Sequence, residues 1–166
     1  FLGEIDRVQS WVAHLIGCLN RHAVRNPSSR LQLVVMLDEA DVFMPQGTAK
    51  PPSKEPLQDL LKRSRSSGLG VVLASQSPAD FDYRSRDLIN TWFVGHIHEP
   101  RAIEKMKGLF EHRPATAGRI SALTNGKFVM LHGGQVSELE RAPSMLFTDQ
   151  LPEAEMLSMA AEKRRT

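Results

Sequence analysis

Residues 31–41 read LQLVVMLDEAD, an apolar run that ends in two adjacent carboxylates, Asp38 and Glu39. The run lacks the regular polar and apolar alternation of a strand with one solvated face. A near-continuous apolar stretch of this length is typical of a strand buried on both faces, as in a parallel sheet. In an open α/β sheet, the carboxyl ends of the strands line the ligand crevice. The Asp38–Glu39 pair is therefore a candidate catalytic site.

Adjacent carboxylates at a strand end can take separate roles in phosphoryl chemistry. Asp38 could hold a hydrated Mg²⁺, because this hard cation prefers oxygen ligands. Glu39 could orient or deprotonate an attacking water. Taken alone, a strand followed by Asp-Glu is more often a solvated acidic turn. The assignment therefore depends on what else the chain provides.

A second apolar run at residues 70–75 predicts another buried strand, and it ends in Ser75-Gln76-Ser77-Pro78. Gln76 would be placed to sense a γ-phosphate or to position a water, although a glutamine of this kind alone is more often a plain loop residue. Between Glu39 and Gln76 lie one loop, one helix and one strand. A right-handed crossover to a neighbouring parallel strand requires this arrangement.

Basic residues give a third signal. Lys62, Arg63 and Arg65 lie at the expected carboxyl end of the helix that leads into the second strand. An Arg there could reach the phosphates of its own or a neighbouring subunit and stabilise transition-state charge. Cations also favour helix C-termini for electrostatic reasons alone, which accounts for one or two of these residues without catalysis.

The remaining pattern predicts helices that alternate with strands. Apolar residues spaced three to four apart predict a helix over residues 2–22. Further helices are predicted at 56–67, 84–90, 99–111, 114–123 and 152–164, a third strand at 91–97, and a hairpin of 126–132 with 135–141 around Gly133-Gly134. We expect an α/β fold whose mostly parallel sheet is flanked by helices, with a C-terminal β-hairpin.

Composition fits one soluble domain, with 166 residues, 41% of them hydrophobic, and a net charge of +2. The single Cys18 excludes an internal disulfide and a Cys-based zinc site. No apolar run reaches the roughly 18 residues of a membrane helix, and no signal peptide is evident, so we expect a cytoplasmic location. The chain opens on Phe1, without Met, directly in a helical pattern, which suggests a piece of a longer protein.

Together these motifs resemble the HerA/FtsK group of P-loop ATPases, and the HerA-like branch in particular. The matching strings are LDEAD at residues 37–41 and RSRSSGLGVVLASQSPAD at residues 63–80, with weaker matches at 89–90 and 126–131. The family pattern is a strand ending in Asp-Glu-Ala-His, an Arg-rich helix end, and a strand ending in Thr/Ser-Gln-x-Pro. The motifs are specific in combination and weak singly.

The resemblance implies a RecA-like core that binds ATP with Mg²⁺, assembles as a homo-hexamer and translocates on double-stranded DNA, with a nuclease as a further partner. Carried over by position, Asp38 is the Walker B residue on the metal side and so part of the cofactor site. Glu39 becomes the catalytic Glu, and Gln76 the sensor that also contacts the nucleotide. Arg65 becomes the Arg that neutralises developing charge, in cis or in trans, and Arg63 a second cofactor-binding candidate.

The chain departs from the family pattern in a connection at residues 44–56 that is longer and more proline-rich than a minimal one, and in two further ways. Asp41 stands where the family has His, and no Gly-x4-Gly-Lys-Ser/Thr loop occurs in residues 1–166. We expect that loop upstream of Phe1, so that residues 1–166 form the C-terminal part of a single RecA-like ATPase domain and are inactive alone. Two alternatives remain: a conjugation- or secretion-type ATPase of the same superfamily, and a non-catalytic regulatory module that lacks Walker A.

Overall fold

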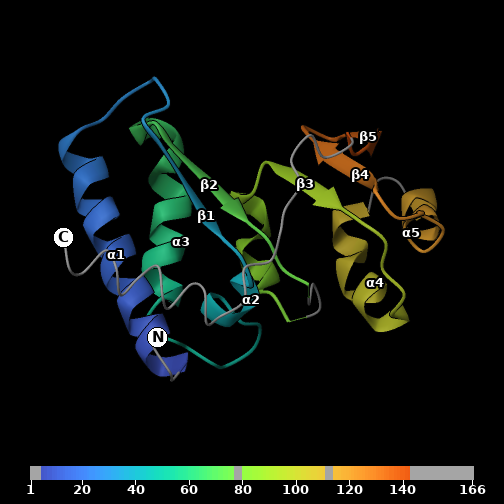
Figure 1. Cartoon of the computed structure of the whole chain (residues 1–166), viewed down its shortest axis with the longest axis horizontal. Coiled ribbons are helices and arrows are strands. Elements are labelled where there is room, and N and C mark those ends of the chain that lie inside the picture. Colours follow the sequence, from blue (N-terminus) through green and yellow to red (C-terminus); the bar gives the residue numbers. More distant parts are fainter. Residues whose placement is uncertain (1–4, 77–79, 111–113, 143–166) are drawn as a thin grey trace, which may run out of the picture.

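The computed structural model describes residues 5–76, 80–110 and 114–142, and Figure 1 shows the order of the elements. These are α1 (Ile5–Arg25), β1 (Leu33–Leu37), α2 (Ala40–Phe43), α3 (Lys54–Arg63), η1 (Ser64–Ser67), β2 (Leu69–Leu73), η2 (Tyr83–Leu88), β3 (Thr91–Val94), α4 (Pro100–Met106), η3 (Lys107–Phe110), α5 (Pro114–Ile120), β4 (Lys127–His132) and β5 (Gln135–Glu140). The helix predicted at 152–164 lies outside the described residues. No helix in the described ranges is long and apolar enough to cross a membrane.

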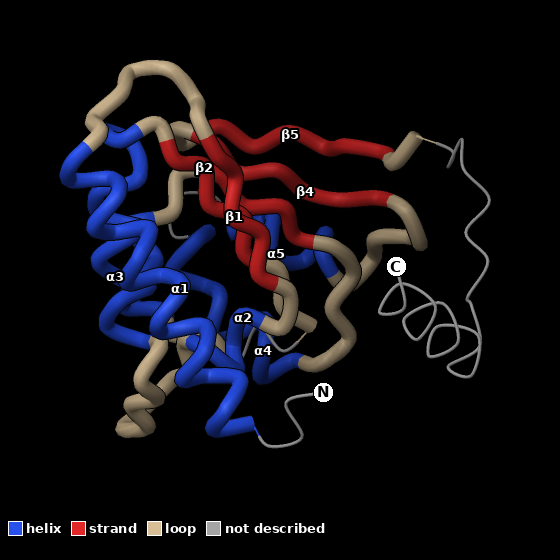
Figure 2. Tube along the Cα trace, turned by 60° about the vertical axis from the view of Figure 1, so that its left-hand side comes forward, coloured by secondary structure: helices blue, strands red, loops and turns tan. Residues whose placement is uncertain are grey.

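The two apolar runs pair as predicted, β1 lying parallel to β2 with Leu33 opposite Leu69 and Leu37 opposite Leu73. Because the strands are parallel and in register, both end at the same edge of the sheet. Figure 2 shows α1 and α3 together on one side of these strands. The core on that side consists of Val12, Ile16, Ala23, Ala40, Phe43, Met44, Leu57, Leu60, Leu61, Leu69 and Phe81.

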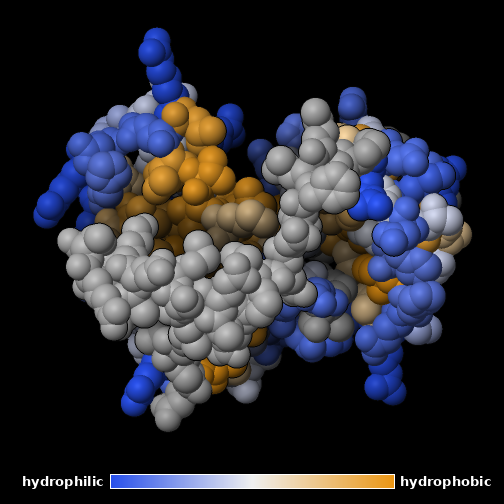
Figure 3. All heavy atoms as spheres, viewed as in Figure 1, coloured by the Kyte–Doolittle hydropathy of each residue, from blue (hydrophilic) through white to orange (hydrophobic). Residues whose placement is uncertain are grey.

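The opposite face of β1 and β2 is exposed, which contradicts the prediction of strands buried on both faces. Val34 is 51% exposed, Met36 67% and Val72 46%. Alternate residues of a strand point to opposite faces. The strand residues that pack in the core with the helices are Val35, Leu37, Leu69, Val71 and Leu73. Nothing in the described part of the chain covers the other face, where Figure 3 shows hydrophobic side chains gathered over β1 and β2.

The third strand also departs from the prediction of a mostly parallel sheet. β3 pairs antiparallel with β4, from Thr91 opposite His132 to Val94 opposite Val129, and so belongs to a separate three-stranded sheet, β3-β4-β5. The predicted hairpin is confirmed, since β4 and β5 pair antiparallel around Gly133-Gly134. Helices α4 and α5 pack on this sheet through a second core: Val94, Met106, Phe110, Ile120, Leu123 and Val129.

Gly68 makes the sharp turn between η1 and β2. Its φ is +64°, and a Cβ at this position would lie 2.1 Å from the carbonyl oxygen of Arg30. Any side chain would therefore collide with fixed backbone, and only glycine adopts this φ without strain. The turn sets the start of β2, and through the register with β1 it sets where both strands end.

Candidate functional site

The polar edge of the sheet is built by backbone pairing that continues past the two strands. The amide of Ala74 donates to the carbonyl of Leu37 at 2.9 Å, and the amide of Ala40 donates to the carbonyl of Ala74 at 2.8 Å. The residues that follow β1 and β2 therefore leave the sheet side by side. This brings the predicted residues Asp38, Glu39 and Gln76 to the edge where α2 begins, because Glu39 directly precedes that helix and Gln76 contacts Glu39. Figure 1 labels α2.

Glu39 and Gln76 are in direct contact. The Nε2 of Gln76 donates a hydrogen bond to the Oε1 of Glu39 at 2.5 Å, across 37 residues of chain. Glu39 is also the only non-glycine residue of positive φ in the described ranges, with φ 51° and ψ 48°. A left-handed conformation costs a residue with a side chain about 1–2 kcal/mol. Such strain gathers at functional sites, where the surroundings enforce it.

Asp38 is exposed, and one of its oxygens accepts the backbone amide of Glu39 at 3.0 Å. No group of three or more His, Cys, Asp or Glu in the described ranges could hold a metal ion unaided. The single exposed carboxylate of Asp38 nevertheless suits Mg²⁺, because this ion is usually bound by one or two carboxylates together with waters and substrate phosphates. Asp38 would be the residue that holds it.

Asp41, the departure from the family pattern, has a structural contact that the sequence did not indicate. Its Oδ1 accepts a hydrogen bond from the Oγ of Ser75 at 2.5 Å. Because Asp41 lies in the first turn of α2 and Ser75 follows β2, this bond ties the helix after Glu39 to the segment that carries Gln76. Both residues are partly buried, so the bond is shielded from bulk water and helps to fix the edge.

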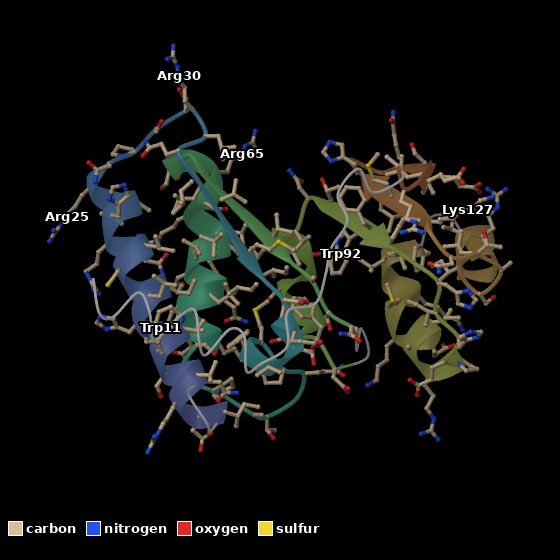
Figure 4. The ribbon with its side chains drawn as sticks, viewed as in Figure 1. Trp11, Arg25, Arg30, Arg65, Trp92 and Lys127 are labelled. Atoms are coloured by element: carbon tan, nitrogen blue, oxygen red, sulfur yellow. The ribbon has the colours of Figure 1, made fainter. Side chains whose placement is uncertain are left out.

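Arg63 and Arg65 lie at the other end of the sheet. Both come just before β2, at the amino end of a strand of five residues, which spans about 17 Å. Figure 4 shows Arg65 near Arg30, at the end of the molecule opposite the α2 edge seen in Figure 1. The fold therefore does not bring either arginine to the Glu39–Gln76 pair of the same chain.

Each arginine faces its own shallow surface pocket. Arg65 and Lys62 line an open pocket of about 570 Å³ together with Ser28, Ser29 and Ser66. Arg63 lines a second pocket between α1 and α3. Both arginine side chains are exposed. This amino edge can offer positive charge and hydroxyl groups to an anion that approaches from outside the chain.

The described residues form an α/β fold in which polar residues follow the carboxyl ends of two parallel strands. No family model and no curated protein sequence matches the chain. Among solved structures, the genome packaging NTPase B204 of Sulfolobus turreted icosahedral virus 2, in complex with AMPPCP, has a similar fold. It is 16% identical with a TM-score of 0.62, over 82% of this chain and 63% of that chain. Its complex with ATP-gammaS matches at 17% identity and a TM-score of 0.55, over 66% and 52%.

A second similar structure is VirB4 of Thermoanaerobacter pseudethanolicus. It is 16% identical with a TM-score of 0.66, and the match covers 86% of this chain but 39% of that chain. At such identities the likeness is one of fold. The chain thus spans less than two thirds of the length of each of these structures.

Proposed function

We propose that this chain forms the Walker B half of an ATP-hydrolysing, HerA-like motor that acts on double-stranded DNA. The observation that carries the proposal is the 2.5 Å hydrogen bond between Gln76 and Glu39 at the carboxyl ends of two parallel strands. The ligand crevice of α/β sheets lies at this edge. A carboxylate and an amide in contact there suit the activation and alignment of a water.

The residues at the edge would divide the chemistry among them. Asp38 would hold Mg²⁺, which in phosphoryl transfer neutralises charge on the phosphate oxygens. Glu39 would polarise the attacking water. Gln76 would hold Glu39 in place and offer its amide to the γ-phosphate. The bond from Ser75 to Asp41 would keep the two segments at a fixed separation during turnover.

The loop that cradles the phosphates would come from polypeptide outside residues 1–166, which contain no Gly-x4-Gly-Lys-Ser/Thr. We place it upstream of Phe1 in the same ATPase domain. The packaging NTPase was solved in complex with ATP-gammaS and with AMPPCP, and the match covers 52% and 63% of its chain, so that protein has further polypeptide outside the matched segment. Without the loop, the residues described above would not bind ATP tightly.

Arg65 would act on the nucleotide of a neighbouring subunit rather than its own. Its position at the amino edge, about one strand length from Glu39, leaves contact in trans as its route to a γ-phosphate. Lys62 lines the same open pocket and would add charge to that surface, and Arg63 would bind the neighbour's phosphates from the pocket between α1 and α3. This arrangement favours a ring, and we propose a homo-hexamer.

Double-stranded DNA as the substrate is supported by the sequence resemblance, and the fold shared with B204, a genome packaging NTPase, is consistent with a nucleic-acid substrate. A nuclease partner is supported by the sequence resemblance alone.

The test of the proposed function is the ATPase rate of the full-length protein with Mg²⁺, measured with and without duplex DNA. Glu39→Gln is expected to slow hydrolysis by about 10²-fold or more. The control Glu55→Gln, on the exposed side of α3, is expected to leave the rate unchanged.

Two results would contradict the proposal. Hydrolysis by Glu39→Gln within about twofold of the parent would remove the catalytic role, since losing a general base costs at least 10²-fold. An ATPase rate that stays the same when duplex DNA is added at low salt would count against a DNA motor, because protein contacts to DNA phosphates are strongest at low salt.

A further inference from the structure

The segments that follow Glu39 and Gln76 are joined by a short antiparallel ladder. Residues 44–46 lie against residues 80–82, with a β-bridge between Pro45 and Phe81. The amide of Asp82 donates to the carbonyl of Met44 at 3.0 Å, and the amide of Gln46 donates to the carbonyl of Asp80 at 2.7 Å. The chain after each site residue therefore enters the same ladder within a few residues.

A buried ion pair closes this ladder. The Nζ of Lys54 lies 2.9 Å from the Oδ2 of Asp82, and the two side chains are 10% and 4% exposed. Lys54 also donates to the carbonyl oxygen of Pro45 at 2.6 Å. Next to it, the fully buried Ser53 donates to the carbonyl of Phe43 at 3.0 Å. Lys54, the first residue of α3, thus contacts both sides of the ladder, and Ser53 just before it binds the residue that precedes the ladder.

Such a pair is poorly explained by stability. Removing two charges from water costs about as much as their attraction returns, so well-packed apolar residues usually serve equally well. What the pair supplies is a link across the ladder, because one ammonium group binds an acceptor on each side, the carboxylate of Asp82 and the carbonyl oxygen of Pro45. That link is made within a few residues of the Glu39–Gln76 hydrogen bond.

We infer that Lys54 and Asp82 are positioning residues, which hold Glu39 and Gln76 at the separation that water activation requires. The inference rests on the proposed function. Neither residue lies at the sheet edge itself, so both act through the ladder. A misplacement of about 1 Å at a reacting group can cost about 10²-fold in rate, so a loosened ladder is expected to lower kcat more than it weakens nucleotide binding.

The ladder has a spectroscopic reporter. Phe81 packs edge-on against Trp92 of β3, with ring centroids 6.4 Å apart and an interplanar angle of 83°. Residues 1–166 have one other tryptophan, Trp11 on α1, which is 56% exposed. A Trp11→Phe background therefore leaves Trp92 as the single tryptophan of this chain. The fluorescence emission of Trp92 and its quenching by acrylamide therefore report how tightly the ladder packs, without depending on ATP hydrolysis.

The test replaces both charges, because a single replacement would leave one buried charge without its partner and destabilise the fold. The full-length protein with Trp11→Phe would carry Lys54→Met together with Asp82→Leu. We expect kcat to fall by about 10-fold to 10²-fold while KM for ATP stays within about threefold. We also expect stronger quenching of Trp92 and an unchanged circular-dichroism spectrum. Any further tryptophans of the full-length protein would be replaced by Phe as well.

The matched control is the exposed ion pair between Arg119 and Glu138, 3.0 Å apart and more than 60% exposed. Arg119→Met with Glu138→Leu is expected to change neither kcat nor quenching, because exposed pairs contribute little. Two results would overturn the inference. One is a double variant of Lys54 and Asp82 that keeps kcat within about twofold of the parent. The other is a double variant in which kcat and the thermal midpoint both fall sharply while KM for ATP rises sharply.

Failure of the proposed function would be visible separately. If Glu39→Gln leaves hydrolysis unchanged, the catalytic assignment fails, and the positioning role is then judged by amide hydrogen exchange at residues 39–46 in the double variant. Faster exchange there, with unchanged exchange in α1, would support it. Unchanged exchange at residues 39–46 would overturn it.

Discussion

Replacing Glu39 by Gly is expected to give a more stable protein than replacing it by Ala, the reverse of the usual order. The backbone of Glu39 is left-handed, with φ 51° and ψ 48°. Both substitutions remove the hydrogen bond to Gln76, so that loss cancels between them. What remains is the difference in backbone energy between the two residues at this position.

Two terms set the magnitude. A Cβ in the left-handed conformation costs about 1–2 kcal/mol, which Gly avoids. Ala loses less conformational entropy on folding than Gly, by about 0.4–1 kcal/mol. The balance favours Gly by roughly 1 kcal/mol, or about fivefold in the unfolding equilibrium. Gly is also the better residue than Ala at a helix N-cap, the position that Glu39 occupies at the start of α2.

The assay is urea unfolding of the two variants, followed by circular dichroism. The control pair is Ser10→Gly and Ser10→Ala in the exposed interior of α1, where Ala should be more stable by about 1 kcal/mol. The reasoning fails if Ala is as stable as Gly at position 39. Glu39 would then not be held in a strained conformation by the edge around it.

Three further outcomes are expected. Leu60→Ala, at a side chain with no exposed surface, should lower the free energy of unfolding by about 2–5 kcal/mol in urea titration. Gly68→Ala should destabilise by more than about 1 kcal/mol, because its Cβ would meet the backbone at 2.1 Å, whereas Gly118→Ala, with open space around it, should not destabilise. Subunits with Arg65→Ala mixed with subunits carrying Glu39→Gln should regain part of the ATPase rate that each lacks alone, because mixed rings contain sites with both intact residues; no recovery would exclude the contact in trans.

The sequence was informative where one local pattern determines one structure. The apolar runs before Asp38 and before Gln76 predicted two strands, and their spacing predicted that these lie parallel. The glycine pair at 133–134 predicted the hairpin, because few residues tolerate the positive φ of such a turn. Once the strands are parallel, the meeting of Glu39 and Gln76 follows from topology.

Other features depend on contacts between distant segments. An apolar run shows that a strand has hydrophobic faces but not what covers them, so the exposure of Val34 and Met36 was missed. β3 pairs with β4 rather than with β1 or β2, and this choice of partner strand depends on contacts between segments that are distant in the sequence. Lys54 and Asp82 lie 28 positions apart in loop-like sequence without periodicity, and no local signal pairs them. The distance of Arg65 from the edge could have been foreseen, since it precedes a strand whose far end carries the site.

The most direct test of the central claim is a double-mutant cycle on kcat in the full-length protein, with Glu39→Gln, Gln76→Ala and both together. If the two side chains form one catalytic unit, Gln76→Ala alone slows hydrolysis at least about tenfold, and the double variant is about as slow as Glu39→Gln. Two results would contradict this site. One is a double variant whose fold-loss in kcat equals the product of the two single losses. The other is a Gln76→Ala variant that keeps the parental kcat.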